Sequence, residues 1–239
     1  MQKTALITGA AIRVGREIAL NLADKDYNIV IHYNSSTSQA EQLAEEIRSK
    51  NVKSYLLKAD LANQDEVSQI IPSLGKQGIS LDLLINNAAM FEKDNIANID
   101  SASWQSHINV NLFASLLLIK DFTAQYKGSS GNVINITDGM DNWSISPTFL
   151  SYSLSKLGLE NATKLLAKEL APNIRINAIA PGPTLEGKQD KEDTFEKLKK
   201  IIPLNRVSMP QEICDTVDYI LASPSLTGQI INLSGGMRI

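Results

Sequence analysis

Short apolar runs alternate with longer amphipathic segments along the whole chain. Seven runs have the length and aliphatic content of strands: Thr4–Thr8, Asn28–Tyr33, Val52–Lys58, Leu81–Ile85, Asn132–Thr137, Ile174–Ile179 and Gln229–Leu233. Helical periodicity fills the gaps: Val14–Ala23, Ser38–Lys50, Gln64–Leu74, Ser103–Tyr126, Ser151–Leu170 and Gln211–Ala222. The strand runs are continuously apolar, which is typical of strands buried on both faces. The pattern therefore predicts an α/β fold with a Rossmann-type, doubly wound parallel sheet of about seven strands and helices on both faces.

Composition narrows the class of protein further. The 239 residues carry a net charge of −3 and a single cysteine, Cys214, so neither an intramolecular disulfide nor a cysteine-based zinc site is possible. The absence of a basic excess argues against nucleic-acid binding. No targeting segment or apolar run of membrane-spanning length is present, so we expect a cytoplasmic protein that contacts no membrane. The two histidines, His32 and His107, have no ligand-spaced neighbours, and we predict no metal. Glu17 and Glu160 are expected on solvated helix faces.

One polar, irregular stretch interrupts the alternation, from Leu185 to Glu196. It is either a solvated loop or short helix, or a lid over a pocket. Its place directly after a strand favours a lid, over about residues 185–202.

The first predicted strand leads into a turn that contains two glycines, Gly9 and Gly15, and then into a helix. Glycines at this junction permit a tight turn and close helix packing, and the helix N-terminus can bind a pyrophosphate. The alternative is a purely structural turn. No acid occurs between Asp26 and Glu41, where an NAD-binding unit places one for the ribose 2′-hydroxyl. Donors at the end of the second strand and the charge of Arg13 favour NADPH, unless this segment is only a polar surface turn. Those donors are His32, Asn34, Ser35 and Ser36.

Tyr152 and Lys156 lie four residues apart at the start of a predicted helix, on one face. A nearby ammonium favours tyrosinate, so we expect Lys156 to lower the pKa of Tyr152 toward a value useful for acid–base chemistry. Alone, this spacing is common by chance.

With the other motifs, the chain resembles the short-chain dehydrogenase/reductase family over nearly its whole length. The resemblance rests on Thr8-Gly9 to Gly15, Asp60-Leu61, Asn86-Asn87-Ala88, Asn111, Tyr152 with Lys156, Asn177 to Pro181-Gly182, Thr227-Gly228 and Gly235-Gly236. It implies that Tyr152 donates a proton, that Lys156 holds the nicotinamide ribose, and that Asn111 supports a proton relay. It implies a cofactor site formed by Gly9, Arg13, Val14, Gly15, His32, Tyr33, Asn34, Ser35, Asp60, Leu61, Asn87, Ala88, Pro181 and Gly182.

Departures from the general family pattern resemble the pteridine reductase branch, which includes dihydromonapterin reductases. Arg13 replaces a glycine of the turn, Asp138 stands where a serine is usual, and Phe91 follows the Asn-Asn-Ala strand. An aspartate beside the tyrosine suits a C=N bond better than a ketone. Phe91 can stack on a flat heterocycle. Arg13 can bridge cofactor phosphate and substrate. The alternatives are a loop cap at Asp138, core filling at Phe91 and a surface residue at Arg13.

The resemblance thus implies an NADPH-dependent reductase of a pterin-like heterocycle, with substrate contacts from Arg13, Phe91, Asp138 and Tyr152. One alternative is a carbonyl reductase of the same family, such as a 3-oxoacyl carrier-protein reductase. Another is an NADP(H)-binding regulatory protein without turnover. We expect one domain over 1–239, with a nucleotide-binding half of about 1–90 and a catalytic half of about 91–239. Family members usually form homotetramers through the helices corresponding to Ser103–Tyr126 and Ser151–Leu170.

Overall fold

A seven-stranded, entirely parallel sheet forms the centre of the molecule, with strand order β3-β2-β1-β4-β5-β6-β7. The structure is a computed structural model that describes residues 2–128, 130–139, 148–186 and 194–238. The strands are β1 (Thr4–Ile7), β2 (Asn28–Tyr33), β3 (Ser54–Lys58), β4 (Leu83–Asn86), β5 (Gly131–Ile136), β6 (Ile174–Pro181) and β7 (Ile230–Leu233). The predicted fold class is confirmed.

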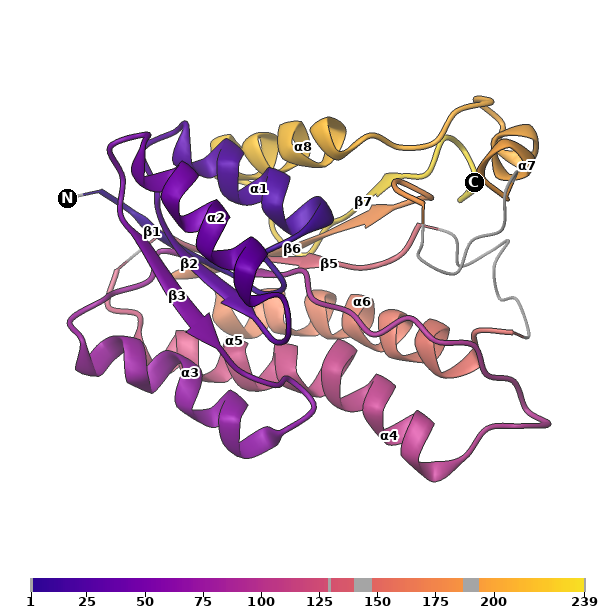
Figure 1. The fold of residues 1–239 in the computed structure, drawn as a ribbon, viewed down its shortest axis with the longest axis horizontal. Helices are drawn as coiled ribbons and strands as arrows, with labels where there is room; N and C mark the ends of the chain where they lie inside the picture. The colour runs from indigo at the N-terminus through magenta and orange to yellow at the C-terminus, as the bar shows by residue number, and fades with distance from the viewer. Residues whose placement is uncertain (1, 129, 140–147, 187–193, 239) are drawn as a thin grey trace.

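Helices cover both faces of the sheet, as Figure 1 shows. One layer contains α1 (Arg13–Ala23), α2 (Thr37–Arg48) and α8 (Pro210–Ala222), and the other contains α3 (Gln64–Lys76), α4 (Ser101–Ile108), α5 (Ala114–Gln125) and α6 (Leu150–Leu170). In the described part of the chain, no helix is long and apolar enough to cross a membrane.

The two helical layers bury separate apolar cores because the side chains of each strand alternate between the faces. Ile7, Ile29 and Ile31 point toward α1, α2 and α8, where they pack with Ile18, Leu22 and their neighbours. Leu6, Val30 and Leu84 point to the other face and pack against α3 and α5. The order of strands reverses between β1 and β4, and a ligand crevice is expected at the carboxyl ends of the strands there.

The predicted helix Ser103–Tyr126 is wrong as a single element. A π-helical turn, η1 (Asn109–Phe113), separates α4 from α5. The apolar pattern does not reveal this break. The additional residue in the π-helical turn places the polar side chain of Asn111 inside the protein, where it is 1 % exposed.

The predicted lid falls partly outside the described residues, which omit 187–193. Within the rest of 185–202, Thr194–Ile201 forms a helix, α7, that the sequence pattern left open. In Figure 1, α7 lies beyond the carboxyl edge of the sheet, close to the C-terminus.

Candidate active site

The turn after β1 packs tightly because it contains glycines where no side chain fits. Gly9 has a φ of +63°, and a Cβ at Gly15 would lie 2.4 Å from the Gly9 carbonyl oxygen. The helix α1 begins directly after it, with no side chain capping its N-terminus. The first-turn N–H groups of Val14 and Gly15 are thus suited to an anion, and the turn fits a dinucleotide pyrophosphate.

Neutral hydrogen bonds hold this turn against the end of β4. The Thr8 hydroxyl oxygen accepts from the backbone N–H groups of Asn87 (2.9 Å) and Ala88 (3.0 Å). The Asn87 amide donates to the Thr8 carbonyl at 2.8 Å. The predicted cofactor residues Asn87 and Ala88 therefore lie beside the glycine turn, with Asn87 acting as its brace.

His32 does not take the role predicted for it. Its ring is 2 % exposed, with Nδ1 accepting from the Gly9 N–H at 3.1 Å and Nε2 donating to the Ala59 carbonyl at 3.2 Å. Burial lowers the pKa of His32 to about 4, partly opposed by the bond to Ala59 and the charge of Asp60. His32 is therefore neutral at pH 7, and neither ring nitrogen remains to donate to a phosphate.

A cavity of 360 Å³ lies at the carboxyl ends of β1, β2 and β4. It is lined by Gly9, His32, Asn34, Asp60, Leu61, Ala62, Ala88, Ala89, Met90, Glu92, Ser106 and Val110. Asn34 and Ser35 are exposed just beyond β2, whereas the predicted Tyr33 is 8 % exposed and packs in the core. Asp60 accepts from the Ala62 N–H through Oδ1 at 2.9 Å.

Arg13 connects the glycine turn to the segment after β6. Its φ is +56°, a region that favours glycine, and its guanidinium donates to the carbonyls of Leu185 (2.9 Å) and Glu186 (2.7 Å). Arg13 therefore binds protein backbone here, at the start of the predicted lid. Nearby, Pro181 and Gly182 are fixed by backbone bonds, from Gly139 N–H to Pro181 and from Gly182 N–H to Leu233.

Tyr152, near the start of α6, donates its hydroxyl hydrogen to Asp138 Oδ2 at 2.7 Å. Asp138 follows β5, so the end of the strand brings its carboxylate to the helix. Lys156 is 4 % exposed; its Nζ donates to the Ile136 carbonyl at 2.8 Å and lies 5.9 Å from the centre of the Tyr152 ring. The predicted constellation of Tyr152, Lys156 and Asp138 is thus assembled in one place.

The expected lowering of the pKa of Tyr152 is wrong in this geometry. Burial, together with the charge and hydrogen bond of Asp138, raises the pKa of the Tyr152 phenol well above its ordinary value. Lys156 is itself affected, since burial lowers its pKa to about 8 against the opposing charges of Asp138 and Glu160. Tyr152 is therefore fully protonated at pH 7, the state that a proton donor needs.

The π-helical turn brings Asn111 to the back of this group. Its side chain accepts from the Met90 N–H at 2.7 Å and donates to the Met90 carbonyl at 2.9 Å and to Ser155 Oγ at 2.9 Å. Ser155 in turn donates to the Tyr152 carbonyl at 2.6 Å. Asn111 thus joins the segment before Phe91 to the helix that carries Tyr152.

The ring of Phe91 lies against Tyr152. It is 56 % exposed, with its ring edge-on to Tyr152 at 4.6 Å and stacked on Phe149 at 4.4 Å. Sequence analysis missed Phe149, since a single aromatic before a helix carries no distinctive signal. A bridge between Asp94 and Phe149 brings the two segments together.

Two further charged residues near the site were also missed. Glu160, expected on a solvated face, is 3 % exposed and forms an ion pair with Arg238. Their separation of 78 residues left no local pattern in the sequence.

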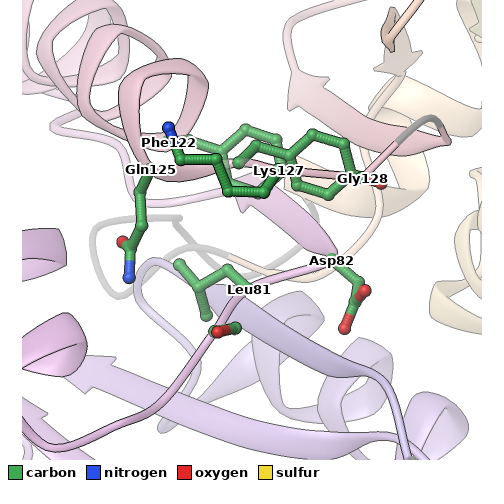
Figure 2. Close-up of a pocket in the computed structure, with 8 residues that line it drawn as sticks. Leu81, Asp82, Phe122, Gln125, Lys127 and Gly128 are labelled. Atoms are coloured by element: carbon green, nitrogen blue, oxygen red, sulfur yellow. The ribbon is translucent and has the colours of Figure 1, made fainter.

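A second cavity, of 180 Å³, lies at the opposite edge of the sheet (Figure 2). Leu81 and Asp82, just before β4, face Phe122, Gln125 and Lys127 across it. It contains none of the predicted site residues, and ligands of open parallel sheets bind at the other edge.

A sequence model of the family described as short chain dehydrogenase matches residues 3–197. The chain belongs to the short-chain dehydrogenase family. It is 34% identical over 246 residues to 3-oxoacyl-[acyl-carrier-protein] reductase FabG of Staphylococcus epidermidis, which covers 99% of both chains.

Among solved structures, FolM Alternative dihydrofolate reductase 1 from Brucella suis, in complex with NADP, superimposes with a TM-score of 0.93. It shares 36% identity, covering 99% of this chain and 95% of that one. The acetoin dehydrogenase YohF from Salmonella typhimurium gives a TM-score of 0.89 at 26% identity, over 99% and 96% of the two chains.

This short-chain dehydrogenase therefore brings most of its predicted site residues to one edge of the sheet. The glycine turn, Asn87 and the Asp60 cavity lie on one side, and Asp138, Tyr152, Lys156 and Phe91 on the other. His32 lines that cavity with both ring nitrogens hydrogen-bonded to the backbone, and Tyr33 packs in the core.

Proposed function

We propose that the protein is an NADPH-dependent reductase that acts on the C=N bond of a pterin-like heterocycle, with Tyr152 as the proton donor. The observation that carries this proposal is the hydrogen bond from Tyr152 to Asp138, with the exposed ring of Phe91 edge-on to the same tyrosine. An acidic partner and an aromatic wall around one phenol suit a flat, nitrogen-containing substrate.

The turn and cavity supply the groups that NADPH needs. The N–H groups at the start of α1 would hold the pyrophosphate, and Asp60 with Leu61 would line the adenine pocket. Asn34 and Ser35, exposed after β2, would face the ribose 2′-phosphate, with no acid between Asp26 and Glu41 to repel it. When bound, NADPH supplies the hydride.

The chain's own residues would supply the proton. Tyr152 is protonated at pH 7 and its hydroxyl is held by Asp138, which orients it and can pass a proton on toward a ring nitrogen. Lys156, four residues along the helix, places a positive charge beside the ring to stabilise the tyrosinate formed when the proton leaves. Asn111 holds Met90 and Ser155, and through them Phe91 and Tyr152, at a fixed spacing.

The test is NADPH oxidation by the purified protein, followed at 340 nm with dihydrobiopterin, dihydromonapterin and dihydrofolate in parallel. We expect turnover with at least one of them. An absence of turnover with all three, in protein that binds NADPH, would contradict the proposal.

The second candidate is reduction of a carbonyl, and the likeness to 3-oxoacyl-[acyl-carrier-protein] reductase favours it. Asp138 argues against it, because a carboxylate that already accepts the tyrosine hydrogen cannot donate to a ketone oxygen. Acetoacetyl thioesters belong in the same assay, and a higher kcat/KM for them than for pterins would reverse the order of the two functions.

A regulatory protein without turnover is the third candidate. It would not need Tyr152 to be hydrogen-bonded to Asp138 beside a buried Lys156. Replacing Tyr152 by Phe separates the cases, since a sensor would keep its function and an enzyme would lose turnover while retaining NADPH binding.

We also propose a homotetramer, with α5 and α6 in its interfaces. Leu154 (44 % exposed) and Leu165 (72 % exposed) of α6 and Phe113 (36 % exposed), just before α5, leave apolar surface on these helices. Light scattering after size-exclusion chromatography should give four times the mass of one chain, and a monomer would contradict this assembly.

A further inference from the structure

Arg238, which follows β7, forms an ion pair with Glu160 on the helix that carries Lys156, and the proposed reaction assigns this pair no role. Arg238 donates from Nη1 to Glu160 Oε1 at 2.8 Å and from Nη2 to Oε2 at 2.6 Å. Nη1 also donates to Asn232 Oδ1 at 3.0 Å, on β7. Such a two-bond pairing fixes the position of the carboxylate as well as its charge.

This carboxylate lies one helical turn from Lys156. Residues four apart on a helix are neighbours on one face, and both Lys156 and Glu160 are almost fully buried, at 4 % and 3 % exposed. Among the described residues, the Lys156 ammonium donates a hydrogen bond to the neutral carbonyl of Ile136. A buried ammonium with a neutral partner needs a negative charge nearby to remain protonated.

We propose that Glu160, fixed by Arg238, is a positioning residue that keeps the Lys156 ammonium charged beside Tyr152. The proposal rests on the proposed function only in taking Tyr152 and Lys156 as the reacting pair, whichever substrate they serve. Asp138 also places negative charge near Lys156, and Glu160 adds to it from the next turn of the same helix.

The charges around Lys156 support this role. In the described part of the chain the charged groups are Glu160 on α6, Asp138 after β5, and Arg238 beside Glu160. The neutral phenol of Tyr152 is the further titratable group that faces Lys156. Burial brings the pKa of Lys156 down to about 8, and Asp138 and Glu160 oppose that fall. Because a pKa of about 8 lies about one unit above neutral pH, the loss of one carboxylate changes the charged fraction of Lys156 there.

The first test is the pH profile of kcat/KM for Glu160→Gln, measured with the substrate that the wild-type protein reduces best. We expect the alkaline limb to move down by about one pH unit, because a charged neighbour changes a pKa by about that much. Glu169→Gln, the same substitution at an exposed position of α6, is the matched control and should leave the limb within about 0.2 unit of wild type.

A second variant covers the case in which Glu160→Gln fails to fold because Arg238 loses its carboxylate partner. Glu160→Gln with Arg238→Met removes both charges, and because Glu160, one helical turn from Lys156, acts on its pKa, the limb should still move down, by less. An unchanged limb in a folded variant of either kind would overturn the proposal, and the ion pair would then be purely structural.

A readout independent of turnover is the titration of Lys156 itself. In cofactor-free protein labelled with ¹³C-lysine, the Cε resonance absent from Lys156→Met identifies the residue. Its midpoint should fall in Glu160→Gln and not in Glu169→Gln. This measurement distinguishes failure of the Glu160 proposal from failure of the proposed function, because the titration of Lys156 does not depend on which substrate the protein reduces.

Discussion

The two sides of the site differ in the kind of groups that form them. On the cofactor side, the glycine turn is held by backbone groups and neutral side chains: Thr8, Asn87 and a neutral His32. On the reaction side, the charged residues Asp138, Lys156 and Glu160 gather around Tyr152, two of them almost fully buried. Both lie at the carboxyl edge of one sheet.

The difference follows from what each side has to do. A pyrophosphate needs close approach and N–H groups, so the turn depends on shape, which glycines and fixed hydrogen bonds supply. A proton donor needs its protonation state controlled, and buried charges do that most effectively. Substitutions on the first side should therefore affect binding and stability, and those on the second should affect rate and pH dependence.

The largest effect is expected at Tyr152. Tyr152→Phe removes the proton donor and should lower kcat by about 10²- to 10⁴-fold, the usual contribution of general acid catalysis. NADPH affinity, measured by fluorescence titration, should stay within about twofold. Tyr219→Phe, at an exposed position of α8, is the control. Loss of NADPH binding in Tyr152→Phe would mean that the two sides are not separable in this way.

His32 gives the next largest effect, on stability. Its pKa of about 4 lies below the ordinary 6.5, so the folded state prefers the neutral ring. The stability that it contributes is complete above pH 6.5 and is lost as the pH falls from 6.5 to 4, by up to about 3 kcal/mol. Urea unfolding of wild type should show this loss.

His32→Asn is the matched comparison, since Asn Oδ1 can still accept from the Gly9 N–H without titrating. Over the same pH range its stability should fall less than that of wild type. Parallel curves for the two proteins would show that His32 does not carry the acid sensitivity of the cofactor side.

Gly15 tests the role of shape. A Cβ in Gly15→Ala would lie 2.4 Å from the Gly9 carbonyl, so the turn must shift, at a cost of about 1–3 kcal/mol and with NADPH binding weakened about tenfold. At Gly78, which unlike Gly15 has a left-handed φ of +72°, a Cβ would meet nothing within 4 Å. Gly78→Ala should therefore lose only the backbone preference and bind NADPH normally. Equal NADPH affinities in the two variants would contradict the importance of close packing.

The same contrast explains what the sequence could predict. The fold was predictable because continuously apolar runs such as Asn28–Tyr33 indicate strands that are buried on both faces of the sheet. The glycine turn and the Tyr152–Lys156 spacing are local patterns, so they too were found. Asp138 was found through the resemblance to a family, by its position after β5.

What was missed depends on contacts between distant parts of the chain. His32 has the residue type of a phosphate donor, and only its bonds to Gly9 and Ala59 show that its ring is occupied. Glu160 is a residue type expected on a solvated helix face. Its burial and its ion pair depend on Arg238, which lies 78 residues away in the sequence. The direction of the Tyr152 pKa likewise depends on burial, which spacing alone does not give.

The smallest effect is expected at Phe91, on the reaction side but without charge. Phe91→Ala should raise KM for a pterin about tenfold, since aromatic stacking contributes about 0.5–1.5 kcal/mol. NADPH affinity should not change, and Tm should change little because the ring is 56 % exposed. Ile96→Ala, on the same segment and 84 % exposed, is the control. If Phe91→Ala instead lowers kcat and leaves KM unchanged, the ring acts through its edge contact with Tyr152 and belongs with the proton donor.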